Sequence, residues 1–426
     1  MLFKVFTPRP QGKQEKHKGR ARFRGFRSAS GLLTALLSAS LLGLSVPAGS
    51  AVAAGSSRGG KADPELMLID VYKALGSDHL RVAQEKAEAL VTAYPNFHLG
   101  QLIYGDLLMM NEHVVNVMGD APNAPEDKLK SLREEAVAHL YAMRAKPDPN
   151  LVPSTVLQLR EDQKHVLLVD ASLSRLFVYE NIDGQLKFQD DYYISQGKLG
   201  VNKQSAGDQK TPLGVYYITG RLPGARLPEF YGVGALPINY PNEWDRVNGR
   251  SGSGIWLHGT PHDSFMRPPL SSDGCVVLAN PDLHKIYESI EPGKTPVVIA
   301  DHVQFVSKEK WISERSAAAK LVDAWRRDVE SANPVRVMAN YSRNFKSPAG
   351  EDLNTWFPKQ AQYAPGTGGV SLSLKDATYF LYPGQQQMMV STFTEEGGGR
   401  AHFQVRKRQY WALEGKDWKI VSETNL

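Results

Sequence analysis

The stretch GIWLHGTPHDSFMRPPLSSDGC, residues 254–275, joins a histidine at the end of an apolar run to the only cysteine of the 426-residue chain. Side chains at strand ends often project into a cleft. Cys275 lies seventeen positions after His258, which is enough for a loop that returns beside the strand. An imidazole next to a thiol can take its proton and later return it to a leaving amine. Cys275 is therefore a candidate nucleophile and His258 a candidate base.

The residues just before the cysteine suit acyl transfer. Gly274 has no side chain to obstruct a substrate carbonyl. The backbone N–H groups of Gly274 and Cys275 are therefore candidate donors to the oxyanion that forms during the reaction. Ser271 and Ser272 are expected to shape the loop, and Ser272 is also a candidate donor to substrate.

Two other interpretations of these residues remain. Cysteine is among the most buried residue types, so a lone thiol can also be an inert part of a core. His258, His262 and Cys275 could instead bind zinc, but Pro261 rules out helical spacing between the histidines and no fourth ligand is apparent. We therefore predict neither a metal nor a cofactor.

The sequence around this stretch, residues 152–306, has the pattern of a β domain. Short alternating or apolar runs are separated by turn residues, as in HVLLVDASLSRLFVYENIDGQLKF at 165–188. One helix is expected in PDLHKIYESI at 281–290. The spacing predicts a mostly antiparallel catalytic domain.

Different patterns flank this domain. In 62–150, apolar residues recur at three or four positions, which predicts a small helical cap with a break at YPN, 94–96. In 310–426, a helix within 313–334 precedes long strands, which predicts a separate α+β domain. The expected fold class is therefore multidomain α+β.

The N-terminus has the order of a secretory signal. The first thirty residues hold nine Lys or Arg and one Glu, and residues 31–54 hold no charge and end in AVAA. We predict a signal peptide at 1–54 and a periplasmic protein, with a retained membrane anchor as the alternative. The leader accounts for more than the whole formal net charge of +5, so the basic pI is no argument for nucleic-acid binding.

The motifs VDASLSRLFVYE, TPLGVYYI, GSGIWLHGT and SSDGCVVLAN resemble, in order and spacing, the YkuD-type L,D-transpeptidase family. The resemblance implies that the substrates are peptidoglycan stem peptides, that Cys275 is the nucleophile and that His258 is the base. It also implies that the backbone carbonyl of Gly259 orients the imidazole ring.

The flanking regions resemble the accessory parts of the L,D-carboxypeptidase branch, which trims stem peptides and sets cell shape. The C-terminal region is similar to the nuclear transport factor 2-like fold, a cone whose hollow often holds a ligand. This resemblance implies a partner or a glycan ligand in the cone, and it leaves the oligomeric state open.

Two positions depart from the family pattern. Asp273 stands where most members have histidine, and Val277 stands where most have arginine. A carboxylate beside the sulfur raises the thiol pKa unless it faces away or His258 offsets it. Arg267 or Arg250 is then the candidate to bind a substrate carboxylate.

Three functions follow from these residues and this resemblance. The first is an L,D-carboxypeptidase or transpeptidase that forms a cysteine thioester. The second is an amidase that releases a lipoprotein lysine from diaminopimelate. The third is a catalytic domain that has become a cell-wall binding scaffold. Intact His258 and Cys275 argue against the third.

Overall fold

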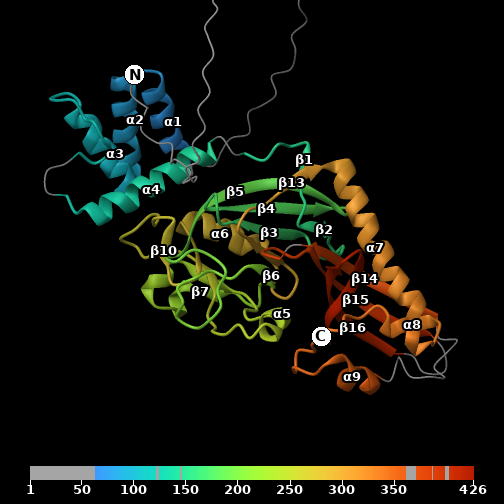
Figure 1. Ribbon diagram of the computed structural model, residues 1–426. Coiled ribbons are helices and arrows are strands. Elements are labelled where there is room, and N and C mark those ends of the chain that lie inside the picture. Colours follow the sequence, from blue (N-terminus) through green and yellow to red (C-terminus); the bar gives the residue numbers. More distant parts are fainter. Residues whose placement is uncertain (1–62, 121–123, 144–145, 361–370, 386, 399–402) are drawn as a thin grey trace, which may run out of the picture. The chain divides into compact units, whose positions relative to one another are not determined.

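The computed structural model describes residues 63–426, with the exception of 121–123, 144–145, 361–370, 386 and 399–402 (Figure 1). The predicted signal peptide at 1–54 lies outside the described residues. Within the part that is described, no helix is long and apolar enough to cross a membrane.

The first region is the predicted helical cap. Its helices are α1 (Pro64–Gly76), α2 (Leu80–Ala93), α3 (His98–Met109) and α4 (Glu126–Ala142). Asp63 caps α1 by accepting hydrogen bonds from two N–H groups of the first turn. The break between α2 and α3 contains the predicted YPN. Its first residue, Tyr94, and the following Phe97 are buried in the cap's core.

A buried ionic cluster fastens the cap to the domain that follows. Glu65 of α1 accepts hydrogen bonds from His139 of α4 at 2.8 Å and from Arg175 at 2.5 Å, and Arg175 also pairs with Asp191. Burial opposes ionisation of Glu65, but His139 and Arg175 outweigh it and lower the pKa of Glu65 to about 2. The carboxylate therefore stays charged at neutral pH.

The middle region forms one ten-stranded sheet in the order β6-β12-β3-β4-β5-β11-β9-β8-β7, with β10 paired to β5. The strands are β3 (His165–Asp170), β4 (Arg175–Ile182), β5 (Gln185–Gly197), β6 (Gly214–Tyr217), β7 (Leu222–Pro223), β8 (Gly234–Pro237), β9 (Trp256–His258), β10 (Leu270–Ser272), β11 (Val276–Leu278) and β12 (Pro296–Ala300). The helical segments are η1 (Gly224–Arg226), η2 (Glu229–Tyr231), α5 (Glu243–Val247) and α6 (Asn280–Ser289).

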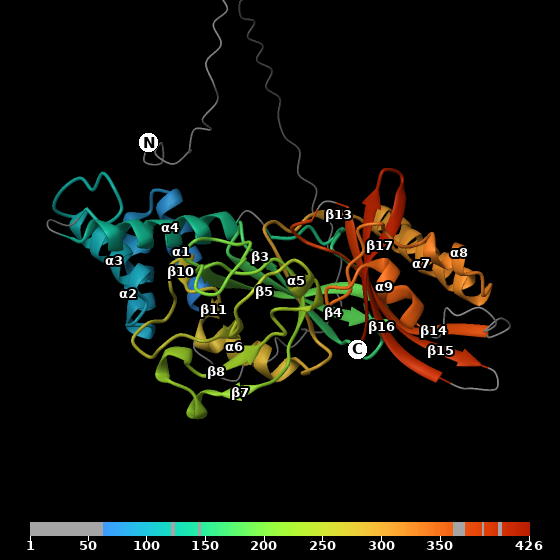
Figure 2. The same cartoon turned by 60° about the horizontal axis from the view of Figure 1, so that its bottom comes forward.

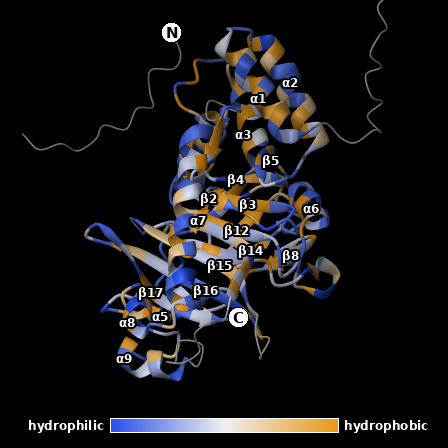
Figure 3. Cartoon of the chain, turned by 90° about the vertical axis from the view of Figure 1, so that its right-hand side faces the viewer, coloured by the Kyte–Doolittle hydropathy of each residue, from blue (hydrophilic) through white to orange (hydrophobic). Residues whose placement is uncertain are grey.

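Most neighbours in this sheet are antiparallel, as predicted. The pairs β12–β3, β11–β9 and β10–β5 are parallel. The strands carry continuous apolar runs (Figure 3), and α6 packs Leu283 and Ile286 into the same core as Leu257 of β9 and Val276 of β11. The two strands next to the predicted catalytic residues are therefore set in the buried core.

The last region is the predicted α+β domain. Its sheet has the order β17-β16-β15-β14-β2, and a separate ribbon pairs β1 with β13. The elements are β1 (Leu151–Pro153), β2 (Val156–Gln158), β13 (Phe305–Ser307), α7 (Lys308–Glu330), α8 (Pro334–Met338), α9 (Leu353–Trp356), η3 (Phe357–Lys359), β14 (Ser371–Leu381), β15 (Met388–Gly398), β16 (Phe403–Glu414) and β17 (Asp417–Asn425). The long helix α7 lies against this sheet (Figure 2) and buries Trp325 in its core.

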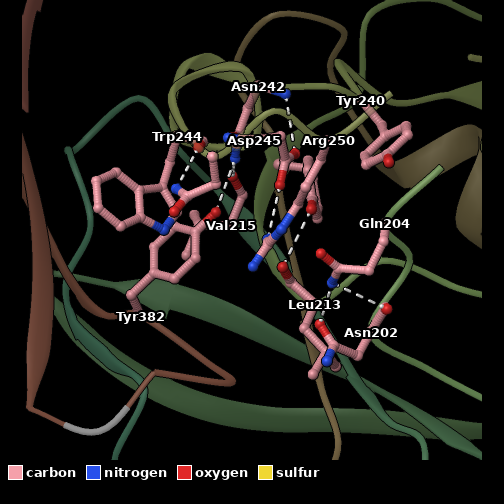
Figure 4. Close-up of polar contacts among 12 residues, drawn as sticks. Asn202, Gln204, Leu213, Val215, Tyr240, Asn242, Trp244, Asp245, Arg250 and Tyr382 are labelled. Atoms are coloured by element: carbon pink, nitrogen blue, oxygen red, sulfur yellow. Dashed lines mark hydrogen bonds and ion pairs between the residues drawn. The ribbon is translucent and has the colours of Figure 1, made fainter. Parts of the chain in front are cut away.

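Helix α5 of the catalytic domain is bound to this C-terminal domain. The amide of Asn242 donates to the hydroxyl of Tyr382 at 3.0 Å (Figure 4). Glu243 accepts hydrogen bonds from Arg408 at 2.8 Å and from the hydroxyl of Tyr410 at 3.1 Å. Trp244 stacks on the Tyr410 ring with centroids 5.5 Å apart.

Candidate active site

Parallel pairing of β9 with β11 brings the two predicted catalytic residues together. The register sets Val276 opposite Leu257 and Val277 opposite His258. Cys275 directly precedes β11, so it is level with Trp256, two positions before His258. Because alternate residues share a face, Cys275 and His258 lie on the same side of adjacent strands.

The imidazole of His258 is fixed in one orientation. Nδ1 lies 2.7 Å from the carbonyl oxygen of Gly259, and the side chain is buried. A carbonyl oxygen only accepts hydrogen bonds, so Nδ1 carries the proton and Nε2 has the free lone pair. His258 is therefore arranged as a base at Nε2.

The thiol and the imidazole are both neutral at rest. Burial lowers the pKa of His258 to about 4, with a further contribution from the charge of Arg267, and the Gly259 hydrogen bond opposes this shift only in part. Burial also raises the pKa of Cys275, and its thiol donates to the Gly254 carbonyl at 3.3 Å. Proton transfer to the imidazole must therefore accompany attack by sulfur on the substrate.

The backbone conformation at position 274 can be adopted without strain only by glycine. Its φ is +128°, and a Cβ there would lie 2.7 Å from the carbonyl oxygen of Lys210. The carbonyl of Gly274 accepts from the Thr211 hydroxyl at 3.0 Å. These contacts fix the path of the chain into the cysteine.

Ser272 binds the loop itself. Its hydroxyl donates to the Cys275 carbonyl at 2.6 Å and accepts from the Gly274 N–H at 3.1 Å. The Gly274 N–H is therefore already paired, which corrects the expectation that it points at an oxyanion. Among the hydrogen bonds of the described residues none is donated by the Cys275 N–H, so this group remains the candidate oxyanion donor.

Asp273 is hydrogen-bonded to groups other than the thiol. Its carboxylate is exposed and accepts from Lys198 at 3.0 Å and from Gln209 at 3.1 Å. The hydrogen bond from Lys198 is the main reason that the pKa of Asp273 is lowered. The charge of Asp273 still contributes to raising the pKa of Cys275, after burial.

Of the two candidate arginines, Arg267 lies near the catalytic pair. One nitrogen, Nη2, donates to the Ser271 carbonyl at 2.6 Å, and the guanidinium lies over the Phe230 ring at 5.2 Å. The other nitrogen, Nη1, is buried and has no hydrogen-bond partner among the described residues. A buried donor of this kind favours an anion.

Arg250 pairs with a carboxylate through Nη1, although its Nε is also buried without a hydrogen-bond partner among the described residues. Its Nη1 donates to Asp245 at 2.9 Å, and both side chains are buried (Figure 4). Within the described residues no group of three or more His, Cys, Asp or Glu is placed to hold a metal ion.

Three aromatic residues, Phe230, Tyr231 and Trp256, form an aromatic wall that borders the site. Strand alternation places Trp256 on the same face as His258, but Phe230 and Tyr231 were not identified from the sequence. Tyr231 lies 5.0 Å from the His258 ring and 4.9 Å from Trp256. Phe230 lies 5.5 Å from His258 and is 47% exposed. For Phe230 and Tyr231, the sequence offers only an aromatic pair between Pro228 and Gly232 as a signal.

Asn280, which the sequence also left unnoticed, joins this wall to the catalytic strand. Its Oδ1 accepts from the N–H groups of Val233 and Thr260 at 3.1 and 3.2 Å, and its Nδ2 donates to the Thr260 carbonyl at 2.8 Å. A Cβ at Gly259 would lie 2.1 Å from Asn280 Oδ1. Glycine is therefore needed at position 259 for this close approach, whereas the carbonyl that orients His258 does not depend on the side chain.

Comparison with known proteins assigns both domains. The model of the YkuD L,D-transpeptidase catalytic domain matches residues 164–299, and that of the Cds6 C-terminal NTF2-like domain matches residues 317–424. The chain carries a YkuD L,D-transpeptidase domain and a C-terminal NTF2-like domain. No match was found among the curated proteins.

Two solved structures are similar in fold over about two thirds of this chain. The structure of Bdellovibrio bacteriovorus Bd1075 is 28% identical, with a TM-score of 0.56, over 65% of this chain and 98% of that one. The helical cell shape determining protein Pgp2 from Campylobacter jejuni is 21% identical, with a TM-score of 0.55, over 67% of this chain and 99% of that one.

Val277 cannot bind a substrate carboxylate in the way expected of the arginine that most family members have at this position. Val277 is buried between Ser195 of β5 and His258 of β9. Its side chain holds no charge, so a cationic group at this site has to come from another element. Arg267, on the loop between β9 and β10, is the candidate that the structure brings near the cysteine.

Proposed function

We propose that this protein is a periplasmic L,D-carboxypeptidase that removes the terminal D-residue of a peptidoglycan stem tetrapeptide and leaves a tripeptide. The observation that carries the proposal is the His258 ring, whose Nδ1–Gly259 hydrogen bond leaves Nε2 free on the same face as Cys275. A YkuD domain supports peptidoglycan acyl transfer as the reaction class.

In the first half of the reaction, Cys275 Sγ attacks the carbonyl carbon of the scissile amide. His258 Nε2 takes the thiol proton as the S–C bond forms, and the Cys275 N–H donates to the oxyanion. The C–N bond then breaks, and His258 returns the proton to the departing D-amino acid. The product is a thioester on Cys275.

In the second half, water replaces the departed amine. His258 Nε2 takes a proton from water, the hydroxide attacks the thioester carbonyl and the C–S bond breaks. The thiolate recovers its proton from His258, which restores the starting state. Every proton in the cycle therefore passes through one imidazole nitrogen.

Arg267 supplies recognition in this proposal. A carboxypeptidase acts on a residue with a free carboxylate, and the unpaired Nη1 of Arg267 is a donor suited to that anion. The exposed carboxylate of Asp273 is paired to Lys198, so it does not compete for Arg267 by direct contact. Recognition thus comes from the loop and not from β11.

A role in cell shape is part of the proposal. Pgp2, which is similar in fold over 67% of this chain, is described as determining helical cell shape. Trimming of stem peptides would act on shape by changing which peptides remain for cross-linking. The periplasmic location rests on the charge order of residues 1–54.

The test is incubation of the purified protein with tetrapeptide and pentapeptide muropeptides, with and without excess D-amino acid, followed by mass spectrometry. We expect tripeptide as the main product from tetrapeptide. Dominant exchanged tetrapeptide or cross-linked dimer would make the protein a transpeptidase. Release of a peptide-linked lipoprotein without tripeptide would make it an amidase, and no mass change with any substrate would leave a binding scaffold.

A further inference from the structure

The loop that carries Arg267 is held by the helical cap. The Phe265 ring lies 4.9 Å from Tyr94 and 5.5 Å from Phe97, the two aromatic residues at the α2–α3 break. The Phe265 N–H donates to the Asn96 carbonyl at 3.1 Å. The Asn96 side chain donates to the His262 carbonyl at 3.0 Å.

A second connection runs through the sheet. The Tyr193 ring of β5 belongs to the cap's hydrophobic cluster and stacks on His139 at 4.3 Å. The Tyr193 hydroxyl donates to the carbonyl of Arg267 at 2.9 Å, and the Ser195 hydroxyl donates to the same oxygen at 2.7 Å. Two hydroxyl groups therefore fix the backbone of Arg267.

The Arg267 guanidinium is fixed in turn. Its contacts with Ser271 and Phe230 leave one buried nitrogen without a protein partner among the described residues. A guanidinium held in this way has lost its conformational freedom before substrate arrives. Its direction then depends on the backbone from which it projects.

We propose that the helical cap is a positioning element for substrate recognition: through Phe265 and Tyr193 it sets the backbone of Arg267 so that the guanidinium meets the terminal carboxylate of the stem peptide. This inference rests on the proposed function. Phe265 and Tyr193 are positioning residues because they act through Arg267, whereas Arg267 itself contacts substrate. The cap then has a measurable role in selecting free peptide ends.

The physical reason is the precision that charge-assisted hydrogen bonds demand. A displacement of about 1 Å at a group that positions substrate is enough to lower the rate by about a hundred-fold. The loop 259–269 has only one short ladder at its end, where β10 pairs with β5. Without the cap, its middle part would lose Tyr94, Phe97 and Asn96 as neighbours.

The experiment compares a tetrapeptide that ends in a free carboxylate with the same peptide amidated at that end. For the wild type we expect kcat/KM to favour the free acid by about ten-fold or more, since hydrogen bonds to charged groups are the strong ones. Arg267→Met should remove this preference. The double variant Tyr193→Phe/Ser195→Ala should reduce it mainly by raising KM for the free acid, with little change for the amide.

Matched variants separate positioning from stability. Tyr72→Phe also removes one buried hydroxyl of the cap, but that hydroxyl has no partner among the described residues, so the acid preference should stay at the wild-type value. Phe265→Ala should reduce the preference, and Phe265→Leu should restore most of it because an apolar side chain again fills the site. Far-ultraviolet circular dichroism verifies that each variant is folded.

The outcomes are distinct. Equal preference for acid over amide in the wild type and in Tyr193→Phe/Ser195→Ala would overturn the positioning role while tripeptide formation still supports the carboxypeptidase. The positioning role is also overturned if the wild type trims both peptides equally well. Absence of tripeptide from the wild type, with no acyl group on Cys275, would instead overturn the proposed function.

Discussion

The two accessory regions hold the catalytic strand β9 from opposite ends and by different chemistry. After the strand, the cap holds Phe265 between two aromatic rings and adds backbone hydrogen bonds. Before the strand, the C-terminal domain holds α5 through Glu243, which pairs with Arg408 and Tyr410. The cap's contact with the loop after β9 is mainly apolar, and its ionic cluster reaches β4 instead, whereas the contact of the C-terminal domain with α5 is charged.

This difference predicts different responses to mutation. Apolar packing is not directional, so a smaller side chain beside Phe265 should let the loop that carries it shift by a small amount. A buried charge pair fails sharply, because the remaining partner is left without compensation. The cap attachment leads to Arg267, and the α5 attachment leads through Arg250 and Ser251 to Gly254, whose carbonyl accepts a hydrogen bond from the Cys275 thiol.

The largest effects are expected from changes to Cys275 and His258, which belong to neither attachment. Cys275→Ala should abolish tripeptide formation and acylation, and His258→Ala should lower kcat by about a thousand-fold, because thiol and base act as a unit. Both losses should occur with free acid and amidated peptides alike. Product mass and intact-protein mass measure them. Turnover by Cys275→Ala would exclude the thioester mechanism.

The next largest effect is expected from a substitution that breaks the charged attachment alone. Arg408→Met leaves Glu243 buried without its cation, which should cost about 3 kcal/mol of unfolding free energy. The activity that remains should show a lower kcat with an unchanged preference for acid over amide, the opposite of the cap variants. Chemical unfolding and steady-state kinetics measure the two quantities.

The control for Arg408→Met is Arg327→Met. Arg327 also pairs with a carboxylate, that of Asp323 at 3.1 Å, but its side chain is 60% exposed. Exposed pairs contribute little, so this change should cost less than about 0.5 kcal/mol. Equal costs for the two variants would show that the α5 attachment is not a buried charge contact in solution.

A third test measures how activity and stability depend on pH, which reports on His258 of β9. Burial lowers the pKa of His258 to about 4, so the base should stay active from neutral pH down to about pH 4, where kcat/KM falls as the ring is protonated. The same shift makes folding less stable as pH decreases from the unfolded value near 6.5 to about 4, because only the unfolded chain then binds the proton. A fall in kcat/KM near pH 6.5 would instead show that the His258 ring is solvated.

The sequence predicted the site best where the chemistry is local. Cys275, His258 and the Gly259 carbonyl lie within one segment, and the motif spacing placed them correctly relative to short strands. Their chemical roles remain predictions until variants are measured. The parallel register of β9 and β11 was not visible, because short apolar runs do not specify which strand they pair with.

Other features depended on contacts that sequence spacing does not encode. The Gly274 N–H was expected at an oxyanion, but the hydroxyl of Ser272, two residues away, pairs with it. The hydrogen bond from Tyr193 to Arg267 joins residues 74 positions apart. A pattern of apolar residues shows that a tyrosine ring is buried, but it does not show where the hydroxyl points.

The smallest expected effect concerns the loop between the two attachments. Asp273→Asn removes an exposed charge that raises the pKa of Cys275, so iodoacetamide should alkylate the thiol at slightly lower pH. Lys198→Met removes the cation that pairs with Asp273 and should shift alkylation to slightly higher pH. Turnover should change by less than about three-fold in both variants, as expected for exposed charges. If both variants shift the pH of alkylation by the same amount in the same direction, the Asp273 charge does not act on Cys275 in the way described.

The strand β2 limits how these domains can be exchanged during evolution. It lies at residues 156–158, before the whole catalytic sheet, yet it forms the edge of the C-terminal sheet by pairing with β14. A gene fragment that begins at residue 310 would therefore encode a sheet whose β14 edge is bare, and a bare edge recruits foreign strands. Recombination that preserves solubility must carry both ends of the catalytic domain together with the C-terminal domain.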